Sequence, residues 1–117
     1  ITFGIDDAVG GSSAGLMFAL AIYDRLTTAD LATGRVVAGT GTVTSDGAVG
    51  AIGGVQEKLA AASRDHATVF LLPKDNCSGV REVPAGMRLV SVATVSEAVA
   101  ALHSLDDPAT QAGVPGC

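Results

Sequence analysis

The sequence is poor in aromatic residues and in positive charge. Only 3% of its 117 residues are aromatic and none is Trp, so a buried core has to be built from Ala, Val, Leu and Ile. Hydrophobic residues still make up 48% of the chain, which suffices for one folded domain and excludes a disordered chain. Lys and Arg number 7 against 12 Asp and Glu, a net charge of −5. Because contacts to phosphates require clustered Lys and Arg, this balance argues against a nucleic-acid partner.

A long hydrophobic run and a targeting segment are also missing. The longest apolar run, residues 14–23, has ten residues, whereas a membrane-spanning helix needs about 18 or more. No signal peptide opens the chain, which starts on a strand-like stretch at residues 1–5 as though cut from a longer protein. We therefore expect that the sequence itself does not encode a location.

Cysteine is scarce, since only Cys77 and Cys117 are present, in no metal-binding spacing. They are either two unrelated thiols or a disulfide. A disulfide would close a separation of 40 residues (117 − 77), and in the chain-entropy model it would add about 4 kcal/mol of stability. It would also indicate an oxidising compartment.

Strands alternate with helices along the chain, which is typical of an α/β fold. We predict strands at residues 1–5, 35–43, 67–73 and 87–92, and a hairpin turn at Asp46-Gly47. Helices are predicted from Ser12 or Ser13 to about Leu26, over 55–65, and over 94–105. The first is apolar nearly all round and is therefore expected to be central and buried. Residues 1–104 form the predicted domain and residues 105–117 a Gly/Pro tail.

The stretch GGSSAG at residues 10–15 is the first candidate for chemistry. Serine at a helix start is most commonly an N-cap. The same stretch could instead cradle a phosphate, because helix N-termini carry free N–H groups and a positive dipole end. A third alternative is a serine nucleophile whose oxyanion is stabilised by those N–H groups.

A serine nucleophile needs a base, and the two histidines, His66 and His103, have no carboxylate partner in any motif. Lysine can also serve as the base. On a helical wheel Lys58 lies at the edge of the apolar stripe that contains Leu59 and Ala62. It either extends its amine into solvent along the core edge or is desolvated, and a desolvated lysine loses its proton more readily and can act as a base.

Thr40 lies in the Gly-rich stretch AGTGTV at residues 38–43. Its hydroxyl could orient a lysine amine. Alternatively it is a β-branched residue in a strand, which is the usual position of threonine.

Together these pieces resemble the proteolytic domain of Lon, the serine–lysine peptidase family. That family has Ser-Ala-Gly at a helix start, Thr-Gly in a strand and Gly-Gly-x-x-Glu-Lys at a second helix start; here these are GGSSAG, GTGT and GGVQEKLAAA. The resemblance runs from about Ile5 to Leu102. It implies the Lon proteolytic-domain fold, related to that of the second domain of ribosomal protein S5, with the N-terminal part of the domain missing.

The resemblance assigns roles residue by residue. Ser13 would be the nucleophile, Lys58 the general base and Thr40 the residue that orients the lysine. Backbone N–H groups near the start of the first helix, at Gly11, Ser12 and Ala14, would form the oxyanion hole. Ser12 stands at the family's usual proline position, a departure that puts a second hydroxyl beside the nucleophile.

Within the family the chain most resembles bacterial membrane-anchored members that carry a PDZ domain. This implies protein or peptide substrates, an extracytoplasmic peptidase domain and, with it, a Cys77–Cys117 disulfide; Lon domains often form homo-oligomeric rings. No Walker A motif is present, so no ATP-dependent step is expected in this chain, and no cofactor or metal is expected either.

Two other functions stay open. VGGSSAG also resembles the phosphate loop of GHMP-type small-molecule kinases, although those proteins are far longer and give GGVQEK no role. A non-catalytic Lon-like scaffold is the other alternative, against which the joint presence of Ser13, Thr40 and Lys58 speaks.

Overall fold

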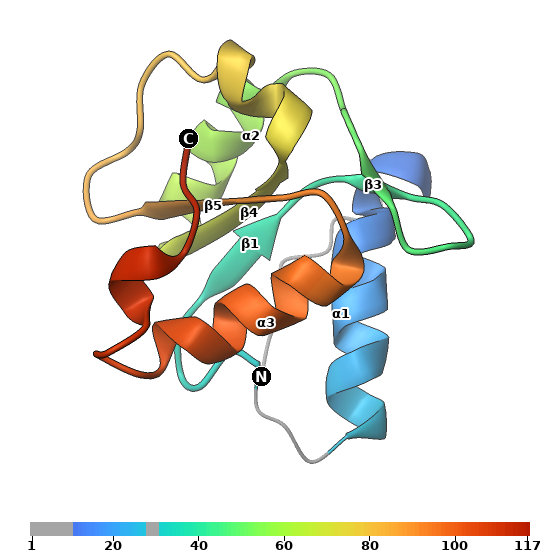
Figure 1. Cartoon of the computed structure of the whole chain (residues 1–117). Helices are drawn as coiled ribbons and strands as arrows, with labels where there is room; N and C mark the ends of the chain where they lie inside the picture. Colours follow the sequence, from blue (N-terminus) through green and yellow to red (C-terminus); the bar gives the residue numbers. More distant parts are fainter. Residues whose placement is uncertain (1–10, 28–30) are drawn as a thin grey trace.

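A three-stranded parallel sheet lies at the centre of the molecule (Figure 1). The computed structural model describes residues 11–27 and 31–117, so the predicted strand at residues 1–5 lies outside the described residues. In the sheet order β1-β4-β5, the strands span Val37–Gly39, Val69–Pro73 and Arg88–Val92. Every residue of β4 is buried, as is typical of a middle strand covered on both faces. The predicted α/β class is confirmed.

Helices cover both faces of this sheet. The helices are η1 Gly11–Ala14, α1 Gly15–Leu26, α2 Val55–Arg64, η2 Lys74–Gly79, α3 Val95–Leu105 and η3 Gln111–Gly113. Because side chains alternate along a strand, Val69 and Leu71 of β4 join the core that contains α1 and α3, whereas Phe70 and Leu72 join the core beneath α2. No helix in the described part of the chain is long and apolar enough to cross a membrane.

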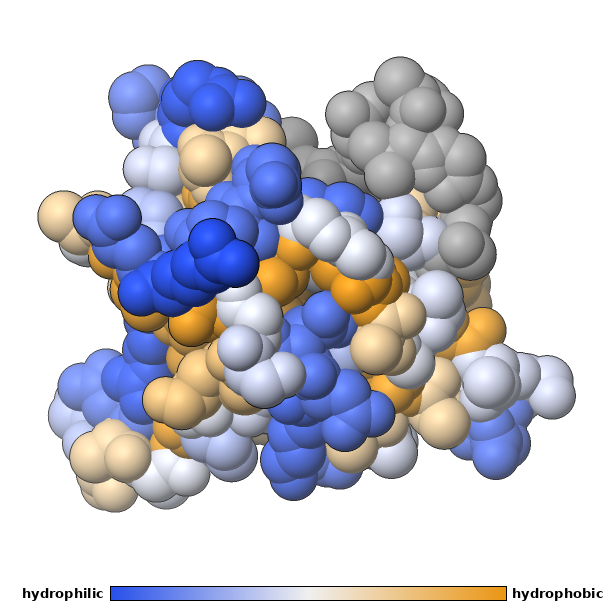
Figure 2. Space-filling view, turned by 90° about the horizontal axis from the view of Figure 1, so that it is seen from above, coloured by the Kyte–Doolittle hydropathy of each residue, from blue (hydrophilic) through white to orange (hydrophobic). Residues whose placement is uncertain are grey.

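Helix α1 differs from its prediction on one side. Leu16 and Leu20 are buried, whereas the side chains of Phe18, Ile22 and Leu26 are 44%, 56% and 81% exposed. The expectation of burial all round was therefore wrong, because α3, β1 and β2 pack only on the other side of the helix. Figure 2 views the molecule from above and shows hydrophobic side chains in several places on this face, with hydrophilic side chains between them.

The predicted hairpin is confirmed. Strands β2 Thr42–Val43 and β3 Val49–Gly50 pair antiparallel. Gly47 in the turn has a φ of +87°, which glycine adopts without steric cost. The Thr44 hydroxyl donates a hydrogen bond to the Asp46 carboxylate, and this bond, with backbone hydrogen bonds, holds the pKa of Asp46 below its usual value.

The C-terminal residues pack against the edge of the sheet. The backbone N–H of Ser91 in β5 donates to the Pro115 carbonyl at 3.0 Å, and the Ser91 hydroxyl donates to the Gly116 carbonyl at 2.9 Å. Val114 is buried. A disulfide joins Cys117 to Cys77 in η2, so the end of the chain is attached to the body at two places.

Candidate active site

Ser13 lies in η1, directly before α1. The N-cap position of α1 is Ala14, with no side-chain cap hydrogen bond, so Ser13 is not the N-cap residue of this helix. The start of the helix is instead attached to the segment after β1: Leu16 N–H donates to the Gly41 carbonyl, and Gly41 N–H donates to the Ser13 carbonyl, both at 3.0 Å. These two bonds hold Ser13 beside the end of β1.

Thr40 is the residue that links β1 to this serine. Its backbone N–H donates to the Leu71 carbonyl at 2.9 Å, so it continues the ladder between β1 and β4. Its side chain is buried, and its hydroxyl donates to the Ser13 carbonyl at 3.2 Å. The hydroxyl therefore points toward the helix start and away from the sheet.

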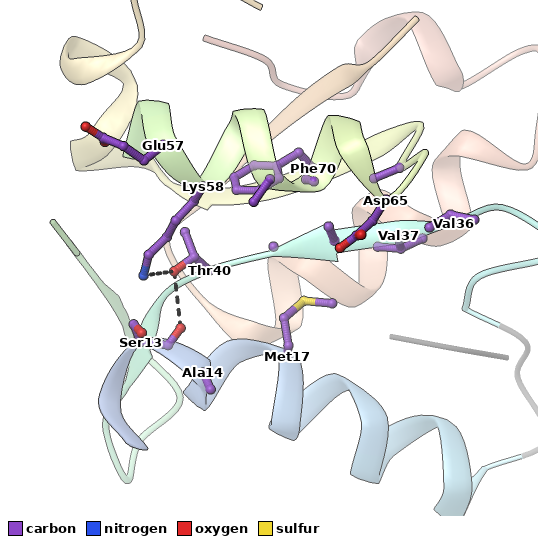
Figure 3. A pocket seen from close by; sticks show the side chains of 15 residues that line it. Ser13, Ala14, Met17, Val36, Val37, Thr40, Glu57, Lys58, Asp65 and Phe70 are labelled. Atoms are coloured by element: carbon purple, nitrogen blue, oxygen red, sulfur yellow. Dashed lines mark hydrogen bonds between the residues drawn. The ribbon is translucent and has the colours of Figure 1, made fainter. Parts of the chain in front are cut away.

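Lys58 reaches the same point from the first turn of α2. Its Nζ donates to Thr40 Oγ1 at 3.4 Å, a partly buried contact (Figure 3). Within the described residues no ion pair involves Lys58 and no hydrogen bond joins its Nζ to Ser13 Oγ. The amine thus lies against a buried hydroxyl rather than extended into solvent, and Thr40 stands between the lysine and the serine backbone.

A cavity of about 270 Å³ opens beside these three residues, between α2, β1 and the first turns of α1. Figure 3 shows Ser13, Thr40 and Lys58 at one end and Asp65 and Val36 toward the other. Its apolar wall is formed by Met17, Val37, Ala38, Ala61, Ala62 and Phe70. The small alanines leave room, so the cavity can accept an apolar side chain next to Ser13.

The remaining predicted residues are placed as follows. Gly11, Ser12 and Ala14 belong to the same η1 turn as Ser13, and their role as oxyanion donors stays a prediction. His66 and His103 are exposed and do not line the cavity.

Among the residues of the apolar cavity wall, only Ala62 was named from the sequence, as part of the stripe beside Lys58. Met17 follows Ser13 by four residues, and Ala62 and Asp65 follow Lys58 by four and seven, so all three share a helix face with a predicted catalytic residue. That spacing was an available signal. No such pattern distinguished Phe70 as a wall residue, because every residue of its strand is apolar.

The family model of the Lon protease (S16) C-terminal proteolytic domain matches residues 7–104. This chain belongs to the Lon family. It is 44% identical over 78 residues to Lon protease of Roseiflexus castenholzii and 38% identical over 78 residues to Lon protease 1 of Bacillus subtilis, in each case over 67% of this chain and 10% of the relative. Lon protease of Chloroflexus aggregans is 37% identical over 102 residues, which is 83% of this chain and 12% of the relative.

This Lon proteolytic-domain chain therefore spans only about a tenth of the length of the curated relatives it matches. The matched region contains Ser13, Thr40 and Lys58 as well as every other residue that lines the cavity. The predicted family and fold are confirmed by this match.

Proposed function

We propose that this domain is a serine endopeptidase in which Ser13 is the nucleophile and Lys58 the general base, acting on unfolded or membrane-associated proteins. One observation carries the proposal: Lys58 Nζ, Thr40 Oγ1 and the Ser13 carbonyl form a continuous line of hydrogen bonds at one end of an apolar cavity. Membership of the Lon family supports peptide-bond hydrolysis. The GHMP-type kinase alternative gives no role to the GGVQEK stretch that contains Lys58.

The reaction proceeds through an acyl-enzyme. The neutral amine of Lys58 takes the proton of the Ser13 hydroxyl as Oγ attacks the scissile carbonyl carbon. The resulting ammonium gives that proton to the leaving amine as the C–N bond breaks, which leaves an ester on Ser13. Water then attacks the ester with Lys58 again as the base, and the products are a carboxylic acid and the restored hydroxyl.

Thr40 sets the direction of the lysine. Because its own proton goes to the Ser13 carbonyl, its oxygen can only accept from Lys58. One N–H of the amine is thus occupied, and the lone pair of the neutral amine is left for Ser13 Oγ. We expect the hydrogen bond between Ser13 Oγ and this amine to form when substrate binds, because catalytic hydrogen bonds often tighten only in the substrate complex.

Backbone N–H groups at the start of α1 are the proposed oxyanion donors. Gly11, Ser12 and Ala14 flank Ser13 in η1, at the positive end of the α1 dipole. Donors of this kind stabilise the negative charge that develops on the carbonyl oxygen in the transition state. No step in this scheme uses ATP.

We further propose, on the resemblance to membrane-anchored members with a PDZ domain, that the domain acts outside the cytoplasm and in a homo-oligomeric ring. The Cys77–Cys117 disulfide supports the location, since disulfides persist in oxidising compartments.

The test replaces each of two adjacent serines. In the full-length protein, Ser13→Ala is expected to lower the cleavage rate of an unstructured protein by roughly 10⁴-fold or more. Ser12→Ala is the matched control and is expected to keep most of the activity. Rates from a fluorescent casein assay, with thermal unfolding to verify the fold, provide the measurement.

Equal cleavage by Ser13→Ala and the parent protein would show that the mechanism is wrong. Loss of activity in Ser12→Ala but not in Ser13→Ala would indicate that Ser12 supplies the nucleophilic hydroxyl. A parent protein that binds ATP through this domain and cleaves nothing would support the kinase alternative.

A further inference from the structure

We propose that Asn76 is a positioning residue for Lys58. Its side-chain amide holds the loop from which α2 begins, and the adjacent Cys77–Cys117 disulfide holds Asn76 in place. The inference rests on the proposed role of Lys58 as the general base, and the experiments below separate the two.

Asn76 binds both backbone polar groups of Ile52, a residue 24 positions earlier. Its Oδ1 accepts from Ile52 N–H at 2.9 Å, and its Nδ2 donates to the Ile52 carbonyl at 2.7 Å. Two short bonds from one planar amide fix both the position and the orientation of the Ile52 peptide units. Both contacts are partly buried, so water competes with them less than at an exposed surface.

Ile52 is connected to Lys58 by a very short path. Two residues later, Gly54 is the N-cap of α2 with a left-handed φ of +69°, and its carbonyl accepts from Lys58 N–H at 3.1 Å. No side chain caps this helix end, and the Gly53-Gly54 pair has little intrinsic stiffness. Asn76 therefore provides a restraint that the loop itself does not.

The segment that carries Asn76 is itself attached to the sheet. Cys77 is bonded to Cys117, and the residues before Cys117 are held on β5 by the two hydrogen bonds of Ser91. Asn76 consequently lies between the end of β4 on one side and a covalent link to the C-terminal segment on the other. Neither Asn76 nor Cys77 lines the cavity, so Asn76 acts on the lysine only through the loop.

A second contact in the same region serves as the matched control. Gln56 of α2 accepts from Arg81 N–H at 2.8 Å and donates to the Glu82 carbonyl at 2.9 Å. This amide also joins α2 to the segment after η2, but none of its hydrogen bonds among the described residues is to Ile52, and it does not line the cavity. Glu82 N–H also donates to the Gln56 side-chain oxygen at 3.2 Å. Replacement of Gln56 therefore removes three side-chain hydrogen bonds, one more than replacement of Asn76, without releasing the loop before Lys58.

In the full-length protein, Asn76→Ala is expected to lower kcat by about 10–100-fold, because a displacement of about 1 Å at a catalytic group has an effect of this size. KM should stay within about twofold, because the cavity wall is untouched. Gln56→Ala should leave kcat unchanged. Both variants are measured well below their unfolding temperatures, so that lost stability alone does not alter kcat.

A second readout does not depend on activity. Under brief acetylation of the native protein, Lys58 should be modified several-fold faster in Asn76→Ala than in the parent, since its amine is released from Thr40. Lys74 is the other lysine of the chain and is already exposed, so mass spectrometry can use it as the internal reference. Gln56→Ala should leave the Lys58 to Lys74 ratio unchanged.

If Asn76→Ala is folded and both kcat and the Lys58 ratio equal those of the parent, the inference is wrong. If Asn76→Ala does not fold, Asn76→Asp takes its place, because Asp keeps the oxygen that accepts from Ile52 N–H and loses the N–H that donates to the Ile52 carbonyl. A smaller fall in kcat is expected for Asn76→Asp. A kcat and a Lys58 to Lys74 ratio equal to those of the parent would again overturn the inference. Full activity of Lys58→Met would instead overturn the proposed function. In that case the ratio of Lys58 to Lys74 acetylation in Asn76→Ala would still show whether Asn76 positions the lysine.

Discussion

Thr40 has one role through its backbone, in the sheet, and another through its side chain, in the candidate active site. Its backbone extends the pairing of β1 with β4, and its hydroxyl connects the Lys58 amine with the Ser13 carbonyl. From the sequence this residue had two explanations: a β-branched strand residue, which is the usual position of threonine, and the orienting hydroxyl that the family resemblance implied. The structure shows that these are compatible, because the side chain of a residue just beyond a strand end is free to face a neighbouring element.

Replacement of Thr40 by Val should keep the backbone role of this residue and remove the role of its hydroxyl. Val keeps the shape of the side chain and removes the hydroxyl, so the hydrogen bonds to Lys58 and Ser13 are lost at a cost of about 1–3 kcal/mol, which corresponds to a fall in kcat of about 5–150-fold. Thr40→Ser keeps the hydroxyl and should retain most of the activity. Steady-state kinetics on the full-length variants measures both, and parental kcat in Thr40→Val would contradict the orienting role.

At the scale of elements, the site depends on how closely β1 and α1 approach each other. The bond from Gly41 N–H to the Ser13 carbonyl requires that the end of β1 lie against the start of the helix. Gly39 allows this approach, because a Cβ at that position would lie 2.9 Å from both the Leu71 carbonyl oxygen and the Met17 sulfur. Hydrophobic periodicity identified the helix and the strand but not their separation, since periodicity describes one element at a time.

Gly39→Ala should therefore destabilise the domain. A contact of 2.9 Å with a backbone oxygen forces a shift of the strand, and overpacking of this kind costs about 1–3 kcal/mol. Gly113→Ala is the control, since a Cβ there meets nothing within 4 Å. Urea unfolding of both variants gives the comparison, and equal midpoints for Gly39→Ala and the parent would show that the strand absorbs the methyl group without cost.

At the scale of the whole molecule, the C-terminal segment closes the fold. Residues 74–79 lie beyond the end of β4, and the Cys77–Cys117 disulfide joins them to the segment that packs on β5. Within the described part of the chain, no element covers the outward side of α1, where Phe18, Ile22 and Leu26 are exposed. The sequence suggested a buried helix because an apolar composition does not reveal which neighbours are present.

Removal of the disulfide should lower the free energy of unfolding by about 4 kcal/mol, the value expected for a closed loop of about 40 residues. Urea unfolding of the full-length protein with and without reductant measures this difference. The Cys77→Ser, Cys117→Ser double variant is the control and should not respond to reductant. Alkylation of intact cells should find both cysteines oxidised; free thiols there would contradict the proposed extracytoplasmic location.

The three α-helices and the strands β4 and β5 were predicted from the sequence in order and type, whereas the predicted strand at residues 35–43 is divided between β1 and β2, which lie in different sheets. Motifs and the family resemblance also identified Ser13, Thr40 and Lys58 as candidates. Helix periodicity, turn residues and short motifs are local properties, and they are readable within a few neighbouring positions. Only the tertiary structure decided that these three residues meet, since they are separated by 27 and 18 positions and come together only because β1 lies between α1 and α2. The contact of Asn76 with Ile52, the cavity wall and the exposed side of α1 were likewise decided by packing, because each depends on which distant surfaces are brought into contact.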